Sequence, residues 1–168
     1  SRALAALLAA DPRPGFERGL NGARAGGVET DLTPERTPWA FALLDGQRTA
    51  LRAVRDGFQL GSEPGSRTAV EAAAEIVQDP TSWTTSVISR PLVQDACLPI
   101  AAYVGGWGEL NYHLTLTPLR RDLGWRAPAF VPRLSATVAS PAAQTALERL
   151  DLTPEAFFAS RGGVVTNR

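Results

Sequence analysis

Residues 89–113 read SRPLVQDACLPIAAYVGGWGELNYH, and residues 127–138 read APAFVPRLSATV. In the first stretch an apolar run, 98–104, leads into a glycine-rich turn at 105–108 and then into a segment with helical patterning. A strand, a glycine turn and a helix start in this order often form anion-binding sites, because the first N–H groups of a helix have no internal partner. The stretch therefore predicts an α/β fold and the place of a functional site.

The second stretch predicts another strand, 129–138, interrupted at Pro132 and separated from the first by a helix over 109–123 that Pro118 bends. Strand, helix and strand in succession are typical of a parallel sheet. We therefore expect an α/β fold with a partial Rossmann-like parallel sheet, flanking helices and buried strands at 100–104 and 129–138. Two parallel strands do not make a stable domain, so the partner strands are expected either elsewhere in this chain or in a part of the protein outside this sequence.

The first part of the chain predicts a small antiparallel subdomain. Asp45-Gly46 separates two apolar runs, 39–44 and 47–54, and both turn residues tolerate the positive φ of a type I′ hairpin. A third strand is expected at 58–60. Before the three strands, at the start of the chain, a helix is expected over 4–10. Residues 16–38 show little apolar periodicity, so much of this segment is expected to be loop, although it could hold one short strand.

The predicted domain division follows from these patterns: a connective region over 1–66, with its β-hairpin near 39–60, and a Rossmann-like α/β portion over 67–168. Further helices are expected at 67–78 (apolar face Val70, Ala73, Ala74 and Val77), 91–97, 141–150 and 154–160, the last two capped by Ser140 and Thr153.

Composition excludes several function classes. The chain has 168 residues, 44% hydrophobic, with 17 basic and 17 acidic residues and a net charge of zero, so nucleic acid and anionic membranes are not expected partners. Every basic residue is arginine, which excludes a Schiff-base or P-loop lysine. The single Cys97 cannot form an internal disulfide, so a cytoplasmic protein with a buried, inert thiol is expected. No apolar stretch reaches the roughly 20 residues of a membrane helix. The sequence does not begin with an initiating methionine, which suggests a trimmed or partial chain.

The glycine turn is the first candidate binding element. Gly105, Gly106 and Gly108 allow backbone N–H groups to face an anion at the helix start. The dinucleotide fingerprint fails, because its third glycine position is Asn111. A turn that needs glycine only for its backbone is the alternative. Trp107 is expected near any ligand held here.

Glu109 and His113 are four residues apart on one predicted helix and share a face. They could act as a general acid/base couple. A metal site is not expected, because the chain has one histidine and one cysteine. The alternatives are a half-buried structural histidine and a glutamate that interacts with the helix dipole.

Arg90 and Arg133 each adjoin a proline, which limits their backbone freedom. A guanidinium group so placed suits a carboxylate or phosphate ligand, and Gln94, one turn after Arg90, could add a hydrogen bond. Ordinary surface ion pairs are the alternative. Asp95 is expected to be a charge on the helix surface.

Three blocks together resemble the bacillithiol biosynthesis cysteine-adding enzymes, the cysteine ligases of the BshC family. They are Arg90-Pro91 with Gln94-Asp95 and Leu98-Pro99; Ala102-Tyr103-Val104-Gly105-Gly106 with Gly108-Glu109 and Tyr112; and Val131-Pro132-Arg133-Leu134-Ser135. Their order and spacing fit, and the match covers the middle portion of such a protein.

The resemblance implies a Rossmann-like core with an inserted connective region, and a C-terminal coiled coil that forms a homodimer. It implies a cytoplasmic ligase that joins L-cysteine to glucosaminyl-malate, both small molecules, in the last step of bacillithiol biosynthesis. The cofactor is left open, with ATP or ADP as the candidate. In this reading Arg90, Gln94, Arg133 and the turn of Gly105, Gly106, Trp107 and Gly108 bind substrate, while Glu109 and His113 handle protons.

One departure keeps two other functions open. Trp107 stands where the family usually has proline, which changes the shape of the turn. The alternatives are a non-catalytic homologue or interaction module, and a Rossmann-type transferase acting on a sugar or nucleotide phosphate.

Overall fold

The computed structural model describes residues 2–28 and 30–159. The chain divides into two compact units, Ser1–Arg133 and Leu134–Arg168. Within the first unit the structure is mixed α/β, as the sequence predicts, with one antiparallel and one parallel sheet. The domain boundary expected near residue 66 stays a prediction.

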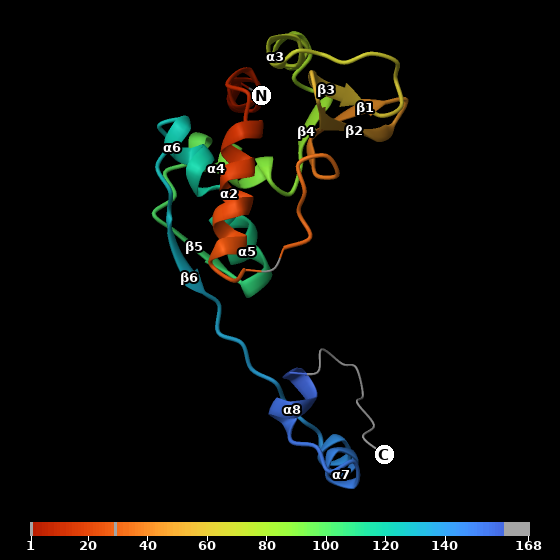
Figure 1. The fold of residues 1–168 in the computed structure, drawn as a ribbon, viewed down its shortest axis with the longest axis vertical. Coiled ribbons are helices and arrows are strands. Elements are labelled where there is room, and N and C mark those ends of the chain that lie inside the picture. The colour runs from red at the N-terminus through yellow and green to blue at the C-terminus, as the bar shows by residue number, and fades with distance from the viewer. Residues whose placement is uncertain (1, 29, 160–168) are drawn as a thin grey trace. The chain divides into compact units, whose positions relative to one another are not determined.

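The antiparallel sheet consists of β1 (Pro38–Leu44), β2 (Gln47–Val54), β3 (Gly57–Leu60) and β4 (Trp83–Thr85), in the order β3-β2-β1-β4 (Figure 1). The predicted hairpin is confirmed: Leu44 pairs with Gln47 across the turn. Asp45 (φ 50°) and Gly46 (φ 76°) both have the left-handed backbone that a type I′ turn requires.

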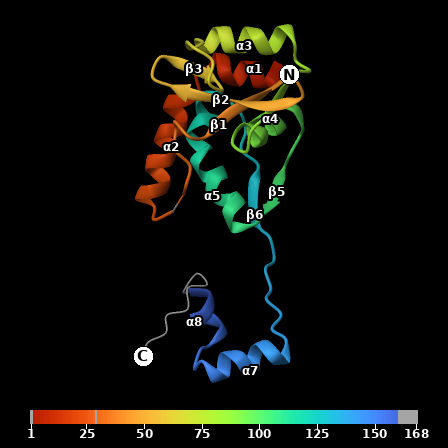
Figure 2. The same ribbon diagram turned by 90° about the vertical axis from the view of Figure 1, so that its right-hand side faces the viewer.

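Helices α1 (Arg2–Ala9) and α3 (Ala69–Gln78) lie against each other on one side of this sheet (Figure 2). Both helices were expected, but the apolar face predicted for α3 was right only at Ala73, which is buried. Val70, Ala74 and Val77 are exposed, and the helix buries Ala72 and Ile76 beside Ala73. An alanine-rich helix has more than one apolar stripe, and small side chains let α1 approach closely, so tertiary packing chose the face.

The loop predicted over 16–38 is wrong in its first part, which belongs to helix α2 (Arg13–Ala25). The described residues between α2 and β1 form no helix or strand, as predicted. Pro12 and Pro14 stand where a helix tolerates proline, at its start. The helix buries one stripe: Gly15, Phe16, Gly19, Leu20 and Ala23. Its glycines resemble loop residues, yet they let α2 pack closely on two later helices, α5 (Trp107–Thr115) and α6 (Thr117–Asp122).

The parallel sheet joins β5 (Ala102–Gly105) to β6 (Ala129–Pro132), with Tyr103 paired to Phe130. Helix α4 (Ser89–Cys97) precedes β5. The bend expected at Pro118 is present as a break between α5 and α6, and Gly124 has the positive φ (65°) of a helix end.

The expectation that both strands of this sheet are buried was wrong. Val104 on β5 is 64% exposed, and Val131 on β6 is also exposed. The core lies instead between the antiparallel sheet and the helices of the first unit. Its largest fully buried apolar side chains are Trp39, Phe16, Phe58, Leu4, Leu7, Leu8, Leu20, Leu51, Ile76, Ile88 and Leu92. Among the described residues β5 and β6 have only each other as sheet partners, so each strand keeps one open edge.

The second unit contains α7 (Pro141–Arg149) and α8 (Pro154–Ala159). Both predicted caps are confirmed: the Ser140 hydroxyl accepts from the Ala143 N–H at 3.2 Å, and the Thr153 hydroxyl accepts from the Ala156 N–H at 3.1 Å. The helix predicted over 154–160 corresponds to α8, and its predicted last residue, Ser160, lies outside the described residues. Over the part of the chain that is described, no helix combines the length and hydropathy of a membrane span.

Candidate functional site

The site forms where β5 ends and α5 begins. Gly106 is the N-cap of α5, and Glu109, three residues on, folds back over it. One carboxylate oxygen of Glu109 accepts the Gly106 N–H at 2.9 Å, and the other accepts the Tyr103 hydroxyl at 3.0 Å. The Tyr103 ring covers Gly105 so closely that a Cβ there would lie 2.8 Å from a ring carbon. A side chain at this position would therefore force the Tyr103 ring to move.

This arrangement changes the expected role of the glycine turn. The Gly106 N–H, which was expected to face an external anion, is already bonded to Glu109. The protein thus supplies its own carboxylate at the helix start. Gly108 is open, with nothing within 4 Å of where its Cβ would stand.

The Glu109 carboxyl is held ionised by its surroundings. The hydrogen bond from the Gly106 N–H lowers its pKa most, followed by the bond from the Tyr103 hydroxyl. The guanidinium charges of Arg133 and Arg90 lower the pKa further. Glu109 therefore carries a negative charge at neutral pH and is a weak base.

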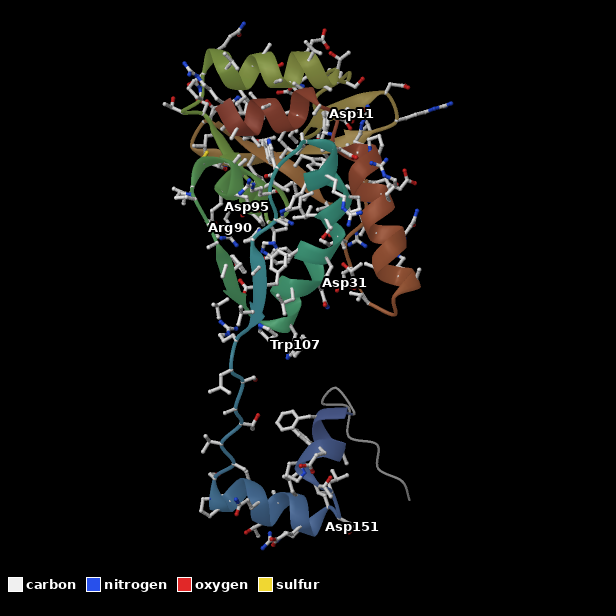
Figure 3. All side chains as sticks on the ribbon, turned by 90° about the vertical axis from the view of Figure 1, so that its left-hand side faces the viewer. Asp11, Asp31, Arg90, Asp95, Trp107 and Asp151 are labelled. Carbon is white, nitrogen blue, oxygen red and sulfur yellow. The ribbon has the colours of Figure 1, made fainter. Side chains whose placement is uncertain are left out.

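Arg90 and Arg133 approach this carboxylate from two different elements. Arg90 lies in the first turn of α4, and its Nη2 is 3.5 Å from the Tyr112 hydroxyl (Figure 3). The backbone N–H of Arg133, just after β6, donates to the Gly105 carbonyl at 2.8 Å. Its Nη2 lies 2.9 Å from where a Cβ of Gly106 would stand. The structure thus brings together three of the residues singled out in the sequence.

Two tyrosines complete the exposed part of the site. Hydrogen bonding to Tyr103 is the main cause that raises the pKa of Arg90. Burial, and then the Tyr103 hydroxyl, raise the pKa of Tyr112 to about 12, so Tyr112 keeps its proton. The Tyr112 phenol can therefore donate a hydrogen bond at neutral pH, and the Tyr103 hydroxyl already donates one to Glu109.

His113 lies beneath this surface and is only 1% exposed. Its Nδ1 is 3.0 Å from Nη2 of Arg120. Because a guanidinium can only donate, Nδ1 accepts and the ring proton sits on Nε2. Within the described residues Nε2 is buried without a hydrogen-bond partner. The ring is enclosed by Tyr103, Tyr112 and Phe130, with centroids 4.5, 5.1 and 4.6 Å away.

The couple expected between Glu109 and His113 is not a hydrogen bond in this structure, because the imidazole bonds to Arg120 instead. Burial is the largest cause that lowers the pKa of His113, to about 4, with the charges of Arg120 and Arg90 adding to it. His113 is therefore neutral at pH 7. Its role in proton transfer stays a prediction.

Asp95 was expected on the helix surface, which was wrong. Its side chain is 4% exposed and that of Arg120 is 1% exposed, with Nε and Nη2 of Arg120 at 2.9 and 2.7 Å from one Asp95 oxygen. Arg120 also donates to the His113 carbonyl at 3.3 Å, and its guanidinium is 5.7 Å from the Phe130 ring centroid. One guanidinium therefore links α4, α5, α6 and β6 beneath the site.

Sequence reasoning gave Tyr103, Tyr112, Arg120 and Phe130 no role in the site, and it placed Asp95 at the helix surface. Weak signals existed for two of them. Tyr103 is two residues before Gly105 and so shares its strand face. Arg120 is seven residues after His113, which is two helical turns along one face. Nothing in the sequence pairs Asp95 with a residue 25 positions away.

The remaining predicted residues have plainer surroundings. Gln94 is half-buried on α4. Trp107 is 68% exposed in the first turn of α5, at the end of the β5–β6 pair (Figure 3). Cys97 is exposed, contrary to the expected buried thiol, because it ends α4 at the surface. Among the described residues no three His, Cys, Asp or Glu side chains are grouped so that they could hold a metal ion.

A parallel strand pair, a glycine turn and a capped helix define a Rossmann-like α/β protein with a charged site at the end of its strands. A family model described as "Bacillithiol biosynthesis BshC, N-terminal Rossmann-like domain" matches residues 23–134. The chain belongs to this bacillithiol biosynthesis family.

Relatives support the same assignment. A protein of Koribacter versatilis named "Putative cysteine ligase BshC" is 36% identical over 112 residues, which is 67% of this chain and 21% of that protein. One of the same name from Heliobacterium modesticaldum is 32% identical over 143 residues, 84% of this chain and 26% of that protein. The chain thus spans about a fifth to a quarter of the length of these curated relatives.

Proposed function

We propose that this chain is part of an enzyme that forms the C–N bond between L-cysteine and the amino group of glucosaminyl-malate. Its family and the names of its relatives support a cysteine ligase of bacillithiol biosynthesis. The cytoplasmic location, the C-terminal coiled coil and the homodimer implied by the sequence resemblance belong to the same proposal.

One observation carries the assignment of the site: an ionised Glu109 with two guanidinium groups close to it at the end of β5. Both proposed substrates carry charges of both signs, because cysteine is a zwitterion and glucosaminyl-malate has an amine and two carboxylates. Arg90 and Arg133 would bind carboxylates, with Gln94 and the 105–108 turn beside them. Glu109 would bind the substrate amino group.

The lowered pKa of Glu109 favours one of two roles for this carboxylate. A strong general base needs a pKa near the working pH, and hydrogen bonds from Gly106 and Tyr103 lower this one. We therefore assign Glu109 first to binding and orienting the amino group, with Tyr103 fixing the carboxylate. His113 would support this surface from beneath through its packing against Tyr103 and Tyr112.

The test is calorimetric titration of the intact protein with L-cysteine and with glucosaminyl-malate. Glu109→Gln removes the charge but keeps an oxygen for the Gly106 N–H, so at least one substrate should bind about tenfold more weakly. Glu71→Gln is the matched control, because Glu71 fills the same position in the capping box of α3. It should bind both substrates as the unchanged protein does.

Two results would contradict the proposal. If the intact protein binds neither substrate, the ligase assignment fails. If Glu109→Gln and Glu71→Gln bind both substrates equally well, the reaction does not use this site. Binding without amide formation would favour the non-catalytic homologue.

A further inference from the structure

A second recess lies between the antiparallel sheet and the first turn of α4. It is a groove of about 380 Å³, lined by Pro38, Phe41, Arg48, Thr85, Ser86, Val87 and Arg90. Its lining contains two arginines and no acidic residue. A chain with zero net charge therefore concentrates positive charge at this place.

Arg48 is held in position without being neutralised. Its guanidinium lies 4.1 Å from the centroid of the Phe41 ring, and its Nη2 donates to the Thr85 carbonyl at 3.4 Å. Stacking on an aromatic face and one bond to a carbonyl leave most of the N–H donors available. Within the described residues neither Arg48 nor Arg90 forms an ion pair, whereas Arg13, Arg18, Arg67 and Arg120 do.

The serine of the groove, Ser86, already has hydrogen-bond partners within the chain. Ser86 and Ser89 bond to each other, with the Ser86 N–H donating to the Ser89 hydroxyl at 2.8 Å and the two hydroxyls 3.2 Å apart. The groove therefore offers the Arg48 guanidinium beside an apolar wall of Phe41, Pro38 and Val87. The Arg90 guanidinium adds a second positive charge, which the groove shares with the Tyr112 hydroxyl 3.5 Å away.

We propose that this groove binds a small ligand that carries a carboxylate or phosphate group on an apolar or planar body. The guanidinium forks of Arg48 and Arg90 match the geometry of either oxyanion. The Phe41 ring and its apolar neighbours contact the body. The groove shares Arg90 with the cluster around Glu109, which consists of Arg90, Tyr103, Glu109, Tyr112 and Arg133. The inference does not rest on the proposed ligase function, because Arg48 belongs to β2 and has no part in that cluster.

The probes are phenyl phosphate, benzoate and inorganic phosphate, titrated into the full chain at low ionic strength and followed by calorimetry. Phenyl phosphate and benzoate distinguish a phosphate from a carboxylate site, and inorganic phosphate lacks the planar body. We expect Arg48→Gln to weaken binding of the preferred aromatic probe about tenfold, because it removes a charged hydrogen-bond donor. Phe41→Leu should weaken the aromatic probe and leave inorganic phosphate unchanged.

Arg52→Gln is the matched control. Arg52 is exposed on the same strand, four residues on and therefore on the same face, but it does not line the groove. Its substitution should change binding less than twofold. Arg48→Lys, which keeps the charge and loses the fork, provides a second variant if Arg48→Gln folds poorly.

Three outcomes would overturn the proposal. One is that none of the probes binds at millimolar concentration. Another is an equal effect of Arg48→Gln and Arg52→Gln, which would indicate a general charge effect. The third is loss of binding with Arg90→Gln but not with Arg48→Gln, which would place the ligand at the Glu109 cluster and leave the proposed function standing.

Discussion

His113 is the only histidine in the chain, and its packing determines how it titrates. Burial holds its pKa at about 4, against 6.5 for an unperturbed histidine. Between pH 6.5 and 4 the unfolded chain binds a proton that the folded chain does not. The free energy of unfolding should therefore be fully retained above pH 6.5 and fall as the pH drops, by about 2–3 kcal/mol at pH 4.

Urea unfolding at pH 7, 5.5 and 4.5 would measure this loss against His113→Asn. Asparagine offers an acceptor oxygen to Arg120 and cannot titrate, so the variant should lose less stability over the same range. The carboxyl groups titrate in both proteins, so the difference between the two profiles isolates the histidine. Parallel profiles would show that His113 is not buried as described.

The buried pair of Arg120 and Asp95 allows a sharper test of the cluster beneath the site. Arg120→Met alone leaves an uncompensated carboxylate and should lower the free energy of unfolding by about 3–5 kcal/mol. Asp95→Leu alone should cost a similar amount. The double variant should be much less destabilised than the sum, because no buried charge remains. Additive effects in denaturant unfolding would contradict a direct, desolvated pair.

At the scale of elements, the packing of α2 on α5 depends on one glycine. A Cβ at Gly19 would lie 1.7 Å from the Thr115 carbonyl oxygen, so Gly19→Ala must force the two helices apart. We expect a loss of about 2–4 kcal/mol in the free energy of unfolding, at or above the upper range for overpacking.

Gly22→Ala, on the same helix, is the natural control for this variant. Nothing lies within 4 Å of where its Cβ would stand, and alanine favours a helix interior by roughly 0.5–1 kcal/mol over glycine. In thermal unfolding, Gly19→Ala should therefore lower the midpoint temperature, whereas Gly22→Ala should raise it. Equal midpoints would mean that α2 does not pack on α5 as the structure shows.

The whole molecule divides between Arg133 and Leu134. The family match ends at the same place, at residue 134. Each unit has its own described helices, and Leu134 and Val138 are exposed at the start of the second. A chain that ends at Arg133 should therefore unfold cooperatively, with a midpoint within about 2–4 °C of that of the full chain, as for a change outside the core. Calorimetry measures both midpoints.

A second truncation serves as the contrast. A chain that ends at Gly106 loses α5 and α6, the helices against which α2 packs, and should not unfold cooperatively. If both truncated chains lost cooperative unfolding, residues 134–168 would be needed for the first unit to fold.

From the sequence, the residues of the candidate site could be predicted better than the contacts that these residues make. Arg90, Glu109 and Arg133 were expected to form parts of one site, and the structure brings them together at the end of β5. These residues could be picked out because they are charged and stand beside or near prolines and glycines. Both features are visible in a few consecutive residues. The partners of these residues were not visible in the sequence, because Tyr103 and Tyr112 reach Glu109 and Arg90 only after the elements pack.

The sequence by itself determined the features that depend on neighbouring residues. These are the Asp45-Gly46 hairpin, the glycine turn before α5, the helix break at Pro118 and the caps at Ser140 and Thr153. Each follows from the φ and ψ angles or the hydrogen bonds available to a few consecutive residues, so short patterns suffice. The resemblance to the cysteine-adding enzymes has the same origin, in three short blocks.

Only the tertiary structure decided features that depend on contacts between distant residues. It made a helix of the glycine-rich 13–25 segment, turned Ala72 and Ile76 of α3 inward, and left β5 and β6 exposed. It also joined Asp95 to Arg120 and gave His113 a buried partner other than Glu109. Burial and charge pairing are properties of the packed chain, because they arise between residues that the sequence places far apart.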